Sequence, residues 1–113
     1  MARLILNYEG VGLVMRELAR DIVMIGRAPS NQIVIDHPTV SDRHAVLVRT
    51  GDSYSLKDLN STNGTQINDM FVTDAELKDG DTIRLGSVIA VFAGCRRKRP
   101  TSKIRKLWTN LGV

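Results

Sequence analysis

Residues 39–45 read Thr-Val-Ser-Asp-Arg-His-Ala and place a hydroxyl, a carboxylate, a guanidinium and an imidazole in four consecutive positions. Apolar runs lie on both sides of this stretch, at 33–35 and 45–48. A polar connection of this kind has two interpretations: its short side chains bond the backbone of their own loop, or they face a ligand. Both interpretations make it a connection between two β-strands.

Short runs of branched and aromatic residues continue in both directions along the chain and predict further strands. They cover residues 4–8, 12–18, 22–26, 33–35, 45–48, 54–58, 66–68, 71–72, 76–77, 82–85 and 88–93. About ten or eleven short strands, with turn signals roughly every eight to twelve residues, are typical of a β-sandwich. The run at 33–35 is continuous, as in a strand buried on both faces. Asn68-Asp69 has the composition of a tight hairpin turn.

The net charge of +4 averages two unlike parts of the chain. Residues 1–94 contain nine lysine or arginine residues against all twelve acidic residues, a net charge of −3. Residues 95–113 contain the other seven basic residues and no acid, a net charge of +7. We therefore expect an acidic globular domain over 1–94, followed by a basic C-terminal tail over 95–113.

The tail begins with a run of like charge, Arg96 to Arg99, and Pro100 then prevents the last strand from continuing. Four apolar residues follow at spacings i, i+3, i+4 and i+7: Ile104, Leu107, Trp108 and Leu111. This spacing predicts a short amphipathic helix with one apolar stripe. Two alternatives are open for the stripe. It packs back on the domain, or the basic tail contacts an acidic partner, a lipid surface or nucleic acid.

Motifs for catalysis and metal binding are missing from the sequence. The chain has two histidines, His37 and His44, and one cysteine, Cys95, without the spacing of a zinc site. It contains neither a nucleophile elbow nor a P-loop. We therefore expect no enzymatic activity, no metal and no cofactor. The acidic charge of 1–94 disfavours specific nucleic-acid binding, and a single cysteine without a signal-peptide pattern favours a cytoplasmic location.

Three polar clusters interrupt the predicted strands, at 26–31, 41–44 and 60–65. Connections at one end of a sandwich converge, so three such loops can build one surface site. Their chemistry suits a phosphate group, because a guanidinium donates paired hydrogen bonds to oxygens and hydroxyls donate single ones. Asparagine, which has both donors and an acceptor, suits a peptide backbone.

Gly26-Arg27, Ser41-x-x-His44 and Ser61-Thr62-Asn63-Gly64-Thr65, in this order and spacing, make residues 1–93 resemble a forkhead-associated (FHA) domain. The resemblance implies an FHA/SMAD-like β-sandwich of about eleven strands that binds phosphothreonine peptides through loops at one end. It implies no catalysis. The implied partner is a protein that a Ser/Thr kinase has phosphorylated.

By position, the resemblance assigns Arg27 and Ser41 to the phosphate oxygens. Arg43 stands where a basic residue adds positive charge near the phosphate or the peptide. Thr62 would border the site, and Asn63 would bond the peptide main chain. The family's preference for phosphothreonine over phosphoserine is attributed to a small pocket for the extra methyl group, whose burial is worth about 1 kcal/mol.

Gly26, His44 and Gly64 match family positions with structural roles: the end of a strand, a side chain that orders a loop, and a turn. Asp42 departs from the family pattern, because a carboxylate beside a phosphate site is repulsive. Two like unit charges about 6 Å apart repel by roughly 3 kcal/mol at an effective dielectric constant of about 20. We therefore expect Asp42 to point outward or to pair with Arg43.

These features are compatible with three functions. The first is a non-enzymatic phosphopeptide-recognition module. The second is an FHA-fold scaffold that binds its partners independently of phosphorylation, with Asp42 marking a lost phosphate site. The third is a membrane or nucleic-acid tether that acts through the basic tail. The first function also allows self-association. Thr101 follows the basic run, and its phosphorylation by a basophilic kinase would let one copy dock in the site of another.

Overall fold

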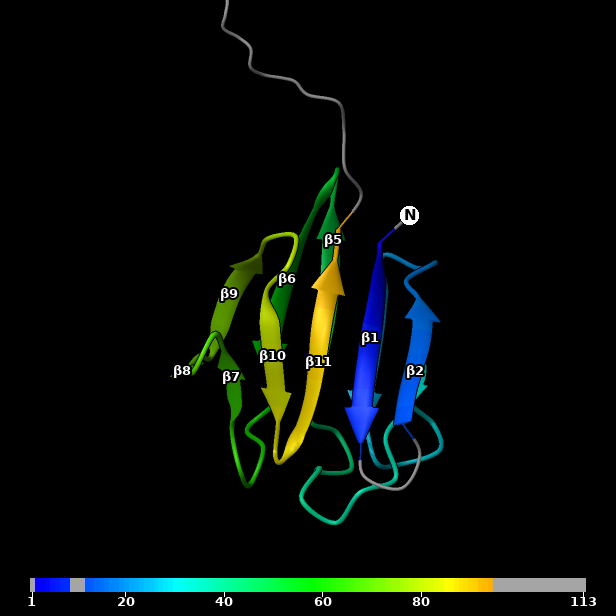
Figure 1. Ribbon diagram of the computed structural model, residues 1–113, viewed down its shortest axis with the longest axis vertical. Helices are drawn as coiled ribbons and strands as arrows, with labels where there is room; N and C mark the ends of the chain where they lie inside the picture. The colour runs from blue at the N-terminus through cyan, green and yellow to red at the C-terminus, as the bar shows by residue number, and fades with distance from the viewer. Residues whose placement is uncertain (1, 9–11, 95–113) are drawn as a thin grey trace, which may run out of the picture.

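Two β-sheets that pack face to face make up the residues that the computed structural model describes, 2–8 and 12–94 (Figure 1). The first sheet has six strands in the order β2 (Gly12–Glu17), β1 (Arg3–Tyr8), β11 (Val88–Ala93), β10 (Thr82–Leu85), β7 (Thr65–Ile67) and β8 (Met70–Phe71). The second sheet has five strands in the order β4 (Ile33–Val34), β3 (Ile22–Gly26), β5 (Ala45–Thr50), β6 (Ser53–Asp58) and β9 (Asp74–Leu77). This architecture confirms the predicted all-β sandwich.

Residues 95–113 lie outside the described residues, and with them the predicted amphipathic helix and Thr101. The division of the chain into a domain over 1–94 and a tail over 95–113 stays a prediction. The described part of the chain holds no helix that is long and apolar enough to cross a membrane.

Alternation of side chains along the strands fills the space between the two sheets. Leu4 of β1 enters the core from the six-stranded sheet, and Leu47 of β5 enters it from the five-stranded sheet; both side chains are fully buried. Tyr54 of β6 and Phe92 of β11 bridge the sheets edge to face, with ring centroids 5.5 Å apart. Each large side chain buried in this way stabilises the fold by about 1.5–3 kcal/mol.

The prediction that the run at 33–35 is buried on both faces is wrong. Ile33 and Ile35 point into the core, but Val34 between them is 37% exposed. The strand β4 lies at the edge of its sheet and pairs only with β3, in parallel. The sheet packs on the other sheet through one face only, so Val34, which alternates with Ile33 and Ile35, faces water on the outer face. Three apolar residues in a row are too few for periodicity to reveal this.

The hairpin predicted at Asn68-Asp69 is confirmed. Ile67 of β7 pairs with Met70 of β8, so the loop has two residues. Both adopt the positive φ that such a tight turn needs, 50° at Asn68 and 70° at Asp69. The hairpin brings Phe71 beside Gly64, where an added Cβ atom would lie 2.6 Å from Phe71 Cε1.

The connections that carry the three polar clusters lie at one end of the sandwich, at the bottom in Figure 1. They are the loops between β3 and β4, between β4 and β5, and between β6 and β7. The strand β11 runs away from this end, so the described chain finishes at Gly94 at the opposite end (Figure 1).

Candidate functional site

An open pocket of about 310 Å³ lies where these three loops meet. Its lining residues are Arg27, Pro38, Thr39, Val40, Ser41, Asp42, Thr62 and Asn63. The fold thus brings together four of the five residues expected to contact the ligand. The fifth, Arg43, is exposed and does not line the pocket.

Arg27 directly follows β3, and its backbone is fastened to the β4–β5 loop. Its N–H donates to the Ser41 carbonyl oxygen at 2.9 Å, and the Ala28 N–H donates to the Asp42 carbonyl oxygen at 3.2 Å. A Cβ atom on Gly26 would overlap that Asp42 carbonyl, so only glycine lets the two loops approach this closely. The Arg27 side chain is 44% exposed at the pocket, where its donors can face a ligand.

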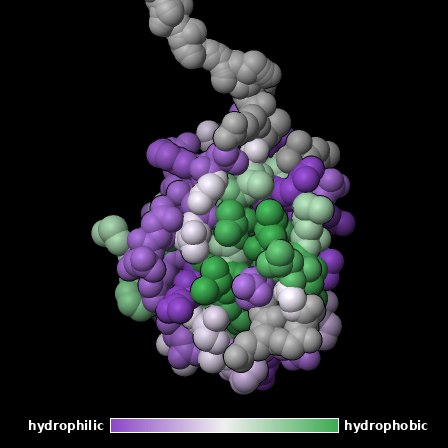
Figure 2. Space-filling model, viewed as in Figure 1, coloured by the Kyte–Doolittle hydropathy of each residue, from purple (hydrophilic) through white to green (hydrophobic). Residues whose placement is uncertain are grey.

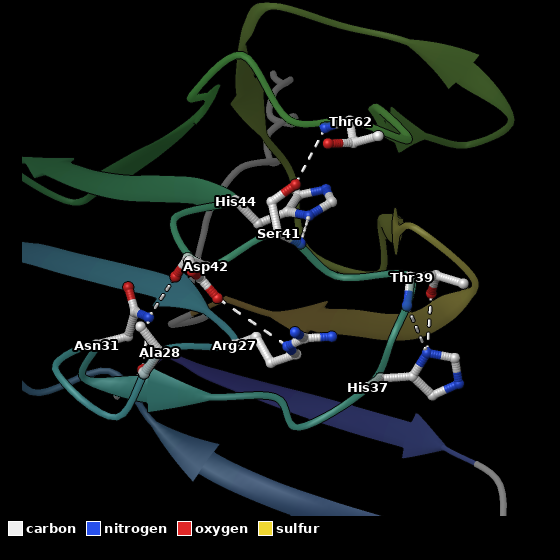
Figure 3. Close-up of polar contacts among 9 residues, drawn as sticks. All are labelled: Arg27, Ala28, Asn31, His37, Thr39, Ser41, Asp42, His44 and Thr62. Atoms are coloured by element: carbon white, nitrogen blue, oxygen red, sulfur yellow. Dashed lines mark hydrogen bonds and ion pairs between the residues drawn. The ribbon is translucent and has the colours of Figure 1, made fainter.

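The Ser41 hydroxyl is oriented by a backbone amide. Its Oγ atom accepts a hydrogen bond from the Thr62 N–H at 3.0 Å (Figure 3). An oxygen that accepts in this way keeps its own O–H to donate to a bound group. The pocket therefore offers an anion a guanidinium and a hydroxyl from two different loops, with the exposed Thr62 side chain beside them.

His44 ties the same loop to the β6–β7 connection. Its side chain is fully buried, its Nδ1 atom accepts from the Ser41 N–H at 3.1 Å, and its Nε2 atom lies 2.9 Å from the Gly64 carbonyl oxygen. Because Nδ1 accepts, Nε2 carries the proton and donates it to Gly64. Gly64 itself adopts a φ of 85°, which favours glycine. His44 therefore sets the positions of Ser41 and Gly64 from beneath the site.

Asp58 is a residue of this site that sequence reasoning missed. Its carboxylate accepts hydrogen bonds from the Ser61 and Thr65 hydroxyls, both at 2.6 Å, and from the Ser61 N–H at 3.1 Å. Ser61 Oγ accepts in turn from the Gly64 N–H at 3.0 Å. Burial would raise the pKa of Asp58, but the bonds from Ser61 and Thr65 outweigh it and lower the pKa below its ordinary value. The available sequence signal is an aspartate three residues before a turn serine, which is typical of side-chain turn motifs.

Thr39 joins the β4–β5 loop to two neighbouring connections. Its carbonyl oxygen accepts from Asn63 Nδ2 at 2.8 Å, and its Oγ1 atom accepts from the Ser87 N–H in the β10–β11 turn at 2.9 Å. The same Oγ1 lies 2.9 Å from His37 Nδ1. Asn63 thus uses one amide hydrogen within the protein and retains its amide oxygen and second hydrogen for a ligand.

Asp42 points to solvent, with 77% of its side chain exposed, and its Oδ1 atom lies 4.0 Å from Arg27 Nε (Figure 3). Of the two alternatives expected for Asp42, the structure shows the outward orientation, and the ion pair that Asp42 makes is with Arg27. The reason lies in the backbone: the Asp42 carbonyl accepts from the Ala28 N–H and from Asn31 Nδ2, which holds this residue against the β3–β4 loop.

The described residues contain no group of three or more histidine, cysteine, aspartate or glutamate side chains that could hold a metal ion. The chemistry that the pocket does offer is anion recognition at a surface, by donors that the surrounding loops hold in place.

The family model of the FHA domain matches residues 23–86, which include all three polar clusters, and the chain belongs to the FHA family. The match covers more than half of the chain. The strands that carry the pocket, from β3 through β7, lie within it except for Ile22, the first residue of β3.

Among curated relatives, the chain is 39% identical over 75 residues to the oxoglutarate dehydrogenase inhibitor of Corynebacterium jeikeium, which covers 66% of this chain and 52% of that protein. The chain thus spans about half the length of this relative. Among solved structures, it resembles the FhaA FHA domain complexed with the intracellular domain of Rv3910, with a TM-score of 0.75 and 36% identity over 81% of this chain and 99% of that one. A further FHA structure, from work on phosphothreonine-dependent FHA domain interactions, shares 33% identity and a TM-score of 0.75 over 84% of this chain and 99% of that one.

Proposed function

We propose that this chain is a non-enzymatic phosphopeptide-recognition module that binds phosphothreonine-containing partner proteins through its pocket. The observation that carries the proposal is the hydrogen bonding of the Ser41 hydroxyl. Its oxygen is already occupied as an acceptor by the Thr62 N–H, so its proton is available to an anion beside the Arg27 guanidinium. A phosphate carries about −1.5 to −2 charges and three acceptor oxygens, which match these donors.

The peptide around the phosphothreonine would meet the side-chain amide of Asn63, whose oxygen and second hydrogen can bond a main chain. Pro38 lines the same pocket and is exposed, so it provides apolar surface for the threonine methyl group. Burying one methyl group is worth about 1 kcal/mol, or roughly fivefold in affinity. We therefore expect a preference for phosphothreonine over phosphoserine, and not an absolute exclusion of phosphoserine.

Calorimetric titration tests this proposal with a degenerate phosphothreonine peptide library and its unphosphorylated twin. The phosphorylated library should bind and the twin should not, and Arg27→Ala should abolish the difference. Arg84→Ala is the matched control, because Arg84 is an exposed arginine of β10 outside the pocket. Equal binding of the two libraries, or no binding of either, would reject a phosphate-dependent function.

The Arg27–Asp42 ion pair favours one alternative, an FHA-fold scaffold that binds unphosphorylated partners. In that case Asp42 occupies the guanidinium in place of a phosphate. Equal binding of both libraries would support it, provided that Arg27→Ala leaves the affinity unchanged.

Self-association through phosphorylated Thr101 is part of the same proposal, and chain length favours docking between copies. Thr101 follows Gly94 by seven residues, which span at most about 25 Å when fully extended. The strand β11 alone carries Gly94 about 20 Å from the pocket end of the sandwich. Docking within one copy would leave only about 5 Å of slack even for a fully extended chain. Sizing of the kinase-treated protein should therefore show dimers or larger species, and Thr101→Ala should stay monomeric.

A further inference from the structure

The outer face of the six-stranded sheet carries a cluster of apolar side chains where alternation would place polar ones. We call it the apolar face, and it consists of Ile5, Leu13, Met15, Ile89 and Val91. Ile5 stands between Met15 and Val91 across β2, β1 and β11, and Leu13 and Ile89 flank Asn7 in the next outward row. Leu13 is 73% exposed, Met15 55% and Ile89 36%.

Figure 2 shows these strands from outside, with a hydrophobic surface at the centre that polar residues surround on the described part of the molecule. The inward residues of the same strands, such as Leu4 and Ala90, already fill the core. The apolar face is therefore additional to what the fold needs. Exposed apolar clusters of this kind in a small domain commonly mark a surface that something covers.

The sequence of the chain contains a segment of matching chemistry. Residues 104–111 place Ile104, Leu107, Trp108 and Leu111 on one stripe of a helix. As a helix, this stripe would be about 10 Å long. The apolar face is also about 10 Å wide, because it extends over two inter-strand spacings from β2 to β11.

The connection to this segment is short and begins close to the apolar face. The described chain ends at Gly94, three residues after Val91 of the apolar face, which corresponds to about 10 Å along a strand. The ten steps from Gly94 to Ile104 can span about 30 Å. The segment therefore reaches the apolar face with slack, and such a tether gives an effective concentration in the millimolar range.

Charge favours the same contact. The segment 95–113 carries a net charge of +7, whereas residues 1–94 carry −3. Glu17, at the end of β2 beside the apolar face, has a 63% exposed side chain, but Arg3 lies 4.0 Å away and balances its charge, so the attraction rests on the net charges of the two parts. Lys103, Arg105 and Lys106 fall outside the apolar stripe, so they can remain in water when the stripe is covered.

We propose that residues 104–111 dock their apolar stripe on the apolar face of the same chain. The contact covers the outer face of β2, β1 and β11 and leaves the pocket at the loop end of the sandwich open. It is independent of phosphopeptide binding.

Trp108 is the only tryptophan of the chain, so its fluorescence reports on this segment. Emission and quenching by acrylamide, which is uncharged, should be measured on the full chain and on a peptide of residues 95–113. In the full chain the emission should be shifted to the blue and quenching should be several times weaker than in the peptide. Met15→Glu should return both towards the peptide values.

Met70→Glu is the matched control, because Met70 is a 70% exposed methionine on β8, away from the apolar face. It should leave the Trp108 signal at its wild-type value. Leu13→Glu is a second disrupting variant, at a position so exposed that the fold does not depend on it. A thermal melt of each variant establishes that the domain is folded.

Two results would overturn the proposal. One is the absence of protection: the emission and quenching of Trp108 in the wild-type chain equal those of the peptide, or those of Met15→Glu equal those of Met70→Glu. The other is loss of the protected signal on dilution, which would assign the stripe to the apolar face of a second copy. Phosphopeptide titration of Met15→Glu should match wild type, so failure here is distinguishable from failure of the proposed function.

Discussion

Replacing Asp42 with asparagine should strengthen phosphopeptide binding. The Asp42 carboxylate lies 4.0 Å from Arg27 Nε. A phosphate that accepts paired hydrogen bonds from the same guanidinium, at about 2.8 Å, would therefore sit about 6 Å from the carboxylate. The substitution keeps the size of the side chain and removes its charge, so it isolates the electrostatic contribution.

The magnitude follows from the exposure of the carboxylate. Because 77% of the Asp42 side chain is exposed, water screens its charge, and an effective dielectric constant of about 80 is more appropriate than 20. A phosphate of −1.5 to −2 charges then experiences a repulsion of about 1 kcal/mol. Competition for Arg27 adds about 0–1 kcal/mol, as for other exposed ion pairs. The expected gain of about 1–2 kcal/mol is roughly a 5- to 30-fold lower Kd.

Calorimetric titration of wild type and Asp42→Asn with one phosphothreonine peptide measures this gain. Repeating it at high salt provides a second criterion, because the Debye length falls from about 10 Å at 0.1 M to about 3 Å at 1 M and the gain should shrink. Asp74→Asn, an exposed aspartate on β9 outside the pocket, is the control for net charge. An unchanged or weaker affinity for Asp42→Asn, or a gain equal to that of Asp74→Asn, would refute the reasoning.

Three further predictions concern stability. Folding lowers the pKa of Asp58, so the Asp58 carboxylate stabilises the fold above its unfolded-state pKa of about 3.9, and this stabilisation is lost as the pH falls through the lower folded-state pKa. In a plot of unfolding free energy against pH, Asp58→Asn should therefore flatten the acid side. His44→Ala should cost about 3 kcal/mol in chemical denaturation, since it leaves a cavity, an unpaired Ser41 N–H and a Gly64 carbonyl with only the 3.4 Å bond from the Gly86 N–H, and an effect below about 1 kcal/mol would contradict this role. Gly26→Ala should cost about 1–3 kcal/mol because the added Cβ overlaps the Asp42 carbonyl, and an unchanged denaturation midpoint would show that the loops can separate freely.

Much of the fold was predictable from local patterns, because strand signals are local. Branched residues, turn residues and alternation mark the eleven strands within a few residues, and Asn68-Asp69 marks a hairpin. The burial of the side chains of β4 was less predictable. Whether Val34 faces the core or water depends on which faces of its sheet are covered, and this is a property of how the two sheets pack.

The position of the site was predictable from motif residues that a given backbone geometry requires. The partners of individual side chains were less predictable. Asp42 was expected to point outward or to pair with Arg43; it points outward, but sequence reasoning did not indicate that it also lies beside Arg27. The choice depends on hydrogen bonds to the Asp42 carbonyl from a loop 11 residues earlier in the chain. The role of Asp58 likewise depends on hydroxyls that only the folded loop brings to it.

Local sequence patterns were enough to identify the strands, the family and the residue types at the pocket: Gly26, Arg27, Ser41, His44 and the run 61–65. These features follow from chemistry that each residue carries wherever it lies. Three features required the folded structure: the Ser41 hydroxyl accepts from the Thr62 N–H, Arg43 does not line the pocket, and five outward apolar residues form one face. Each of these depends on distances between segments far apart in the chain, which strand order and register set and which no local pattern encodes.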